Sequence, residues 1–100
     1  MGNYFKTIWT ETAKAQLRSI HDYLKYDKHT PQGAANVKKD LLNAVKTISF
    51  EEQYQKDEFQ TEYRRIIVRQ YKIIYKVEND TVYVMRIFRT TNNPNKQEYL

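Results

Sequence analysis

The sequence contains no cysteine, and its 100 residues include only two glycines, two prolines and one tryptophan. Without cysteine there is no disulfide and no thiol chemistry, and neither a Cys/His zinc site nor a Cys/His hydrolase is expected. No run of about 18 apolar residues occurs, so no transmembrane helix is expected. The first residues show no secretion signal. We therefore expect a cytoplasmic protein without metal, cofactor or membrane contact.

The length matches one domain, which we expect to span residues 1–100. The net charge is +5, and it is unevenly distributed along the chain. Residues 1–59 carry nine Lys/Arg and eight Asp/Glu, whereas residues 60–100 carry eight and four. The surplus of positive charge in the C-terminal part indicates a polyanionic partner there, although weakly.

Two amphipathic helices are predicted in the first half of the chain. Residues 4–9 are typical of a short strand, after which Thr10 can cap a helix that runs to about Lys25. Thr30-Pro31 is typical of a second helix start, and that helix is expected to end near Ser49. The apolar side chains of each helix recur at helical spacing. They are Trp9, Ala13, Leu17, Ile20 and Leu24 in the first helix, and Val37, Leu41, Ala44, Val45 and Ile48 in the second.

From residue 63 the apolar period changes to two, which predicts strands at 63–68, 71–77 and 81–88. Arg69-Gln70 and Asn79-Asp80 are the expected turns. One sheet face then receives Ile66, Val68, Tyr71, Ile73, Tyr75, Val77, Val82, Val84 and Phe88. The other face receives Tyr63, Arg65, Ile67, Lys72, Ile74, Lys76, Tyr83, Met85 and Ile87.

These elements predict an α+β fold with the order β-α-α-β-β-β. The two-helix hairpin should pack on the apolar face of a twisted antiparallel sheet, because its own apolar stripe must be buried. The first strand is expected to join as an antiparallel edge. The segment 50–62 and the tail from Arg89 onwards are expected to be irregular.

The segment 63–76 holds five cations and no acid, which makes it the first candidate for a binding site. Strand alternation places Arg65, Lys72 and Lys76 on one face and Arg64 on the other. Cations interleaved with tyrosines suit a phosphate backbone with stacked bases. They equally suit a solvated sheet face whose charges prevent aggregation. Arg89 is a further candidate, and the acidic segment 51–58 offers counter-charges for the arginines near the C-terminus.

An ordered set of motifs spans nearly the whole chain and resembles the RelE/ParE superfamily of toxins. Its parts are Trp9-Thr10-x-x-Ala13-x-x-x-Leu17-x-x-Ile20-x-x-Tyr23-Leu24, Pro31-x-x-Ala34-Ala35, Tyr63-Arg64-x-Ile66-x-Val68-x-x-Tyr71-Lys72-Ile73-Ile74-Tyr75, Ile87-Phe88-Arg89-Thr90 and Asn93-Pro94. The resemblance implies a type II toxin–antitoxin system, of the kind used in plasmid stabilisation, with a cognate antitoxin. It also implies a toxin that acts either on ribosome-bound mRNA or on DNA gyrase.

The nuclease branch of this resemblance implies a metal-independent endoribonuclease. In it, Lys72, Arg89 and Tyr99 match the catalytic positions, and Arg64 matches a further basic one. An arginine usual before Gln-Asn-Pro in the tail is missing from Thr91-Asn92-Asn93-Pro94, which weakens this branch. The gyrase-inhibiting branch needs no such set. A non-toxic basic binding module that retains the fold is the third alternative.

Overall fold

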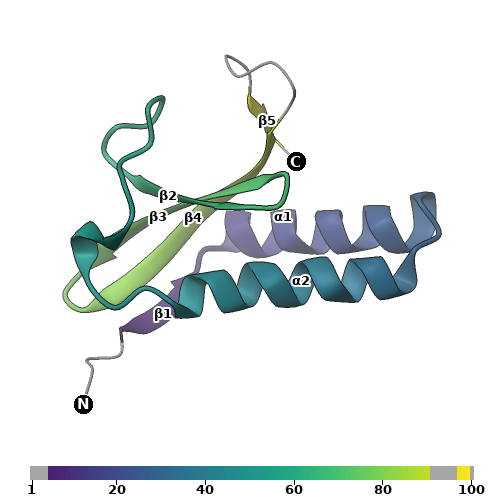
Figure 1. The fold of residues 1–100 in the computed structure, drawn as a ribbon, viewed down its shortest axis with the longest axis horizontal. Coiled ribbons are helices and arrows are strands. Elements are labelled where there is room, and N and C mark those ends of the chain that lie inside the picture. Colours follow the sequence, from purple (N-terminus) through teal and green to yellow (C-terminus); the bar gives the residue numbers. More distant parts are fainter. Residues whose placement is uncertain (1–4, 91–96, 100) are drawn as a thin grey trace.

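A computed structural model describes residues 5–90 and the backbone of residues 97–99 (Figure 1). Along the chain lie β1 (Lys6–Trp9), α1 (Glu11–Asp22), η1 (Tyr23–Asp27), α2 (Pro31–Lys46), η2 (Glu51–Gln53), β2 (Arg64–Val68), β3 (Tyr71–Glu78), β4 (Thr81–Thr90) and β5 (Gln97–Tyr99). The α+β architecture is thus confirmed, with a two-helix hairpin lying against one face of the sheet. No helix in the described part of the chain is long and apolar enough to cross a membrane.

The helix boundaries follow local signals in the sequence. The Thr10 side chain accepts a hydrogen bond from the backbone N–H of Ala13 at 3.2 Å, which caps α1 as predicted. After Asp22 the chain continues as a single π-helical stretch, η1, rather than as a regular helix. Pro31 occupies the first turn of α2, where its missing N–H leaves no helix bond unmade. This second helix ends at Lys46, three residues before the predicted end.

The sheet has the order β1-β4-β3-β2, with β5 also pairing with β4. Both predicted two-residue turns form, and Asn79 and Asp80 have the positive φ angles (53° and 59°) of a type I′ hairpin. The expectation that the first strand is an antiparallel edge is wrong, because β1 runs parallel to β4. A parallel neighbour requires a long crossover, and the helical hairpin between β1 and the remaining strands supplies it.

The second edge of β4 is shared between two strands and helix α1. Its first half pairs with β1 and its last three residues pair with β5, so the tail is not wholly irregular as expected. Between them, the Thr10 hydroxyl donates to the carbonyl of Val84 at 2.9 Å. The buried Gln16 side chain accepts from the N–H of Ile87 at 2.7 Å. Two polar side chains therefore satisfy a stretch of backbone that no strand covers.

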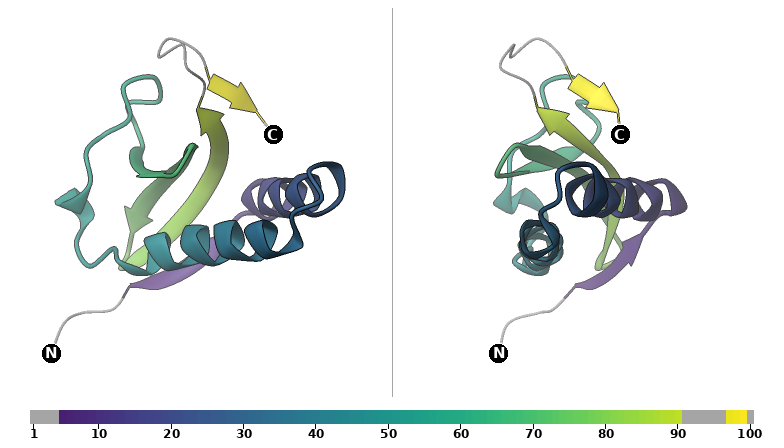
Figure 2. Two further views of the ribbon diagram at one scale, coloured as in Figure 1. Left: turned by 45° about the vertical axis from the view of Figure 1, so that its right-hand side comes forward. Right: turned by 90° about the vertical axis from the view of Figure 1, so that its right-hand side faces the viewer.

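The core lies between the hairpin and the sheet (Figure 2). Its sheet side contains all the residues predicted for it except Phe88, and Ile87 takes that place. The register of β3 and β4 passes from Ile74–Arg86 to Tyr75–Val84, which leaves Met85 in a bulge. A bulge adds one residue to one strand and so reverses the facing of all that follow. Phe88 therefore lies on the face opposite the helices, beside Lys72.

Candidate functional site

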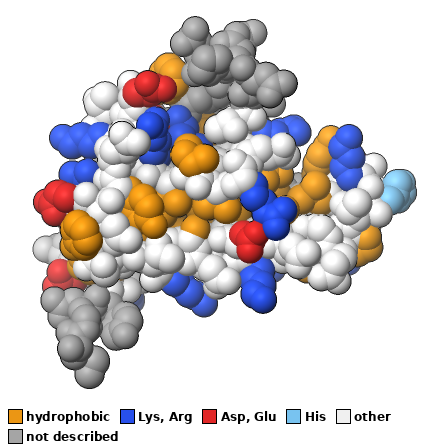
Figure 3. Space-filling view, in the orientation of Figure 1, with side chains coloured by type: hydrophobic (Ala, Val, Ile, Leu, Met, Phe, Trp, Pro, Cys, Tyr) orange, Lys and Arg blue, Asp and Glu red, His pale blue; other side chains and the backbone are white. Residues whose placement is uncertain are grey.

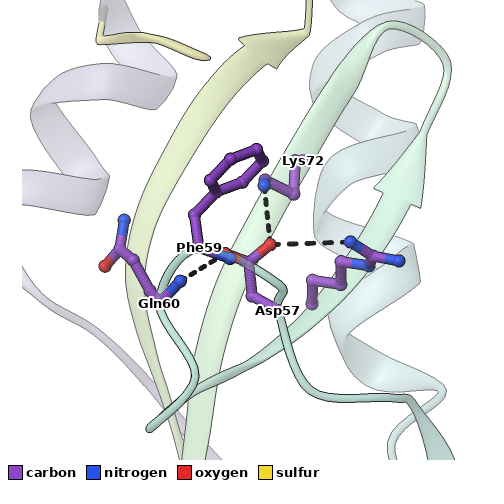
Figure 4. A network of polar contacts seen from close by, with 5 residues as sticks. Asp57, Phe59, Gln60 and Lys72 are labelled. Carbon is purple, nitrogen blue, oxygen red and sulfur yellow. Dashed lines mark hydrogen bonds and ion pairs between the residues drawn. The ribbon is translucent and has the colours of Figure 1, made fainter. Parts of the chain in front are cut away.

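Lys72, a residue of the predicted site, is the second residue of β3 and lies on the sheet face opposite the helices. The residue is only 4% exposed, contrary to the expectation of an open basic face. The Nζ atom lies 2.6 Å from Oδ1 of Asp57, 5.1 Å from the Phe59 ring centre and 5.8 Å from the Phe88 ring centre. An ammonium group so buried requires a charged partner, and Asp57 provides it (Figure 4).

Asp57 anchors the segment before β2 over this sheet face. It is 1% exposed and accepts hydrogen bonds from the backbone N–H groups of Phe59 at 3.0 Å and Gln60 at 2.7 Å. Arg65 approaches the same carboxylate at 3.7 Å. Burial raises the pKa of Asp57, but the hydrogen bonds from Lys72, Gln60 and Phe59 and the Lys72 charge outweigh it. The pKa therefore lies below its ordinary value of 3.8.

The covering segment follows the outer edge of β2. Lys56 forms a single β-bridge with Arg64, and the N–H of Arg65 donates to the carbonyl of Gln55 at 3.1 Å. The Arg64 guanidinium donates to the carbonyl of Tyr54 at 2.8 Å. Segment 54–63 is therefore an extension of the sheet edge that folds across the Lys72 face. Its sequence has no clear periodicity, so only an irregular segment with counter-charges was predicted there.

On the sheet face opposite the helices, the remaining basic surface is less continuous than the sequence predicted. Lys76 lies 3.7 Å from Glu78 and 5.4 Å from the ring centre of Tyr83. In the space-filling view, Lys and Arg side chains surround β2 and the preceding segment, with separate hydrophobic side chains between them (Figure 3). Two of the exposed hydrophobic residues of the chain are Phe59 and Ile67, at 47% and 55% exposure. This is a mixed surface rather than a continuous track of cations.

Arg89 does not lie beside Lys72. It is inside β4, not in a loop after it, and its partner in register on β3 is Tyr71, a residue of the helix-side core. Its guanidinium lies 5.4 Å from the ring centre of Tyr23, and both line a pocket of about 200 Å³ with residues of α1. Lys72 and Arg89 are therefore on opposite faces of the sheet.

Tyr99, the third predicted catalytic residue, belongs to β5, where its backbone is paired opposite Phe88. The tail motif at 91–96 lies outside the described residues. Arg65 joins Lys72 at Asp57, whereas Arg64, Lys76 and Arg89 each have different neighbours. The candidate residues are thus distributed over two faces and one edge of the sheet. No group of His, Cys, Asp or Glu within the described residues could hold a metal ion.

Comparison with known proteins agrees with this architecture. Residues 7–94 match the model of the family described as the ParE toxin of the type II toxin–antitoxin system parDE. Among solved structures, one titled "Chromosomal ParDE TA system from P. aeruginosa" is similar, with a TM-score of 0.72 and 20% sequence identity. The match covers 87% of this chain and 97% of that one, and at this identity it supports the fold. No curated protein matches the sequence. Because the family match extends over most of its length, the chain belongs to the ParE toxin family of type II toxin–antitoxin systems.

Proposed function

We propose that this chain arrests bacterial growth by inhibiting DNA gyrase in the cytoplasm, and that a cognate antitoxin neutralises it. The observation that carries the choice of target is the Lys72–Asp57 pair of 2.6 Å. RNA cleavage without a metal requires cations that are gathered at one phosphate, to stabilise the charge that develops there. Here the Lys72 charge is already neutralised and covered, and Arg89 is on the other face of the sheet.

A protein target places no such demand on the chain. An interface needs exposed apolar anchors with charges around them. Phe59 and Ile67 are exposed apolar side chains, and Arg65 lies two residues before Ile67 in β2, on the same face of the sheet. Phe59 and Ile67 are exposed and can contact a partner protein. Ribosome-dependent cleavage of mRNA is the alternative function, and the experiment must distinguish it from gyrase inhibition.

The test compares two assays of the purified chain. In a supercoiling assay with bacterial gyrase, relaxed plasmid and ATP, we expect loss of supercoiled product or trapped cleaved plasmid. In a reconstituted translation reaction, primer extension should show intact message. Unaffected supercoiling at excess chain would exclude gyrase inhibition, and message cut within the ribosome would establish the nuclease alternative.

A double variant sharpens the comparison. Asp57→Asn with Lys72→Met removes both buried charges and leaves side chains of similar size. We expect it to inhibit gyrase as the wild type does, because the pair supports the fold and does not contact the target. A folded double variant that has lost all activity would instead assign the pair to the active surface. The heat-unfolded chain serves as the negative control.

A further inference from the structure

Helix α2 has a polar face that points away from the rest of the molecule. The helix packs mainly against α1, η1 and β2, and its buried side chains face the core. In the right-hand view of Figure 2, it is seen along its axis at one side of the molecule. The exposed side chains on the side opposite the core are Gln32, Asn36, Lys39, Asn43 and Lys46. We call these five residues the outer face of α2.

The outer face of α2 carries cations and amides but no acid. Lys39 and Lys46 make no ion pair with the described residues. Asp40, the single acid of α2, is paired with Arg69 of the β2–β3 turn at 2.7 Å. Lys38 adds a third exposed cation on the flank of this face. The outer face of α2 therefore has a positive charge that the fold leaves uncompensated.

The shape of this region matches its charge. A shallow depression of about 470 Å³ runs beside the outer face, and all three lysines of α2 line it. None of the described side chains that line this depression is acidic. An anion that enters it meets only cations and neutral groups, so a polyanion is the partner that the charge favours.

The lack of apolar anchors argues against a protein as the partner of this face. Protein interfaces depend on large apolar or aromatic side chains near their centre. The exposed apolar residues of α2 are only Pro31 and Ala35, both of which are small. Phe59 and Ile67, in contrast, belong to the opposite side of the sheet. Lysines and amides without such anchors are typical of surfaces that contact a phosphate backbone.

The spacing of the lysines favours duplex DNA among the polyanions. Lys39 and Lys46 are seven residues apart, which corresponds to about 10.5 Å along the helix axis. The major groove of B-form DNA is about 12 Å wide. If α2 lies across this groove, the two lysines reach the phosphates on its two borders. Asn43, between the lysines in the sequence, then faces the edges of the bases.

We propose that the outer face of α2 binds duplex DNA, with Lys39 and Lys46 on the phosphates that border the major groove. The proposal goes beyond gyrase inhibition and does not depend on it. Because this face lies on the helical side, the chain would contact DNA with α2 and a protein target with the opposite side of the sheet. The two contacts would not exclude each other.

The test is a titration of a fluorescein-labelled DNA duplex with the purified chain, followed by fluorescence anisotropy. We expect a Kd of roughly 1–100 µM near physiological salt, the range of binding that is dominated by phosphate contacts. The affinity should fall linearly with salt on a double logarithmic scale. Each phosphate contact contributes about 0.9 to the steepness of that line, so the slope counts the contacts.

Two double variants with the same change in charge test which lysines make the contacts. Lys39→Gln with Lys46→Gln should lower the steepness by about 1.8, because two phosphate contacts are lost. Lys25→Gln with Lys28→Gln removes the same charge from exposed residues near the tip of the helical hairpin, and its slope should equal that of the wild type. Glutamine is a good helix former, and circular dichroism establishes that both variants are folded.

An RNA duplex of the same sequence tests the contact across the major groove. The major groove of A-form RNA is deep and narrow, so its borders do not match the spacing of the two lysines. We expect the RNA duplex to bind several times more weakly than the DNA duplex. Equal affinity for both duplexes would overturn the assignment to the major groove.

Two further results would overturn the proposal as a whole. Unchanged anisotropy at about 50 mM salt, where phosphate contacts are strong, would show that the chain does not bind DNA. Equal losses in the two double variants would show that DNA responds only to the net charge of the chain. Gyrase is absent from this titration, so its outcome is independent of whether the chain inhibits gyrase.

Discussion

Replacing Asp57 by Asn tests whether its carboxylate holds segment 54–63 on the sheet. The substitution keeps the size of the side chain but removes its charge. Lys72, only 4% exposed, would then retain its ammonium between the rings of Phe59 and Phe88 without a counter-charge. Breaking a buried ion pair on one side in this way costs about 3–5 kcal/mol. That is a large part of the roughly 5–15 kcal/mol that stabilises a domain.

The assay is urea unfolding at neutral pH, monitored by circular dichroism. With a slope of roughly 1.5 kcal/mol per molar, the expected loss lowers the midpoint by roughly 2–3 M. Asp40→Asn is the matched control, because Asp40 pairs with Arg69 at 2.7 Å but both side chains are about half exposed. An exposed pair contributes only about 0–1 kcal/mol.

A second variant separates the charge from the shape of the site. Adding Lys72→Met to Asp57→Asn removes the uncompensated ammonium, and we expect most of the lost stability to return. Replacing both members of a buried pair by groups of similar volume is often neutral. If Asp57→Asn has the same midpoint as Asp40→Asn, or if the double variant is no more stable than Asp57→Asn alone, the pair does not hold the segment and the reasoning is wrong.

Three further predictions concern buried polar groups. Folding lowers the pKa of Asp57, so the stability that its carboxylate contributes is present above about pH 4 and is lost as the pH falls through the pKa of the folded state. The difference in urea midpoint between the wild type and Asp57→Asn should therefore become smaller from pH 7 to about pH 3. Tyr75→Phe should leave the free energy of unfolding unchanged or raise it by up to about 1 kcal/mol. The Tyr75 hydroxyl is buried and makes no well-formed hydrogen bond among the described residues, and burial raises its pKa to about 12. A clear loss of stability in the thermal melt would show that the hydroxyl is satisfied. Gln16→Leu should cost about 1–3 kcal/mol, because it leaves the buried N–H of Ile87 unpaired, whereas the exposed Gln32→Leu should change the urea midpoint little.

The order of the elements could be predicted because it depends on local chemistry. Thr10 and Pro31 mark helix starts through caps that need only a few neighbouring residues. Asn79 and Asp80 tolerate the positive φ angles of their turn, which fixes the register of the β3–β4 hairpin near that turn. Each of these signals acts over a few neighbouring residues, so it can be recognised in the sequence.

The facing of the last strand could be predicted only as far as the bulge. Val82 and Val84 lie in the core as predicted, but beyond Met85 the alternation reverses, and Ile87 and Phe88 exchange places. A bulge is fixed by the fit of a strand to its neighbours, here to α1, whose Gln16 binds the Ile87 backbone. A regular alternation of apolar residues carries no sign of it.

The sequence also could not show which positive charges remain unpaired in the fold. The sequence places the surplus of cations in residues 60–100, yet there Asp57 engages Lys72 and Arg65, and Asp40 engages Arg69. Each of these acids comes from the other half of the chain. Helices α1 and α2 present exposed cations as well, among them Lys14, Arg18 and Lys38. Charge counted by segment therefore could not show which cations are neutralised, because neutralisation is decided by which side chains the fold brings within about 4 Å.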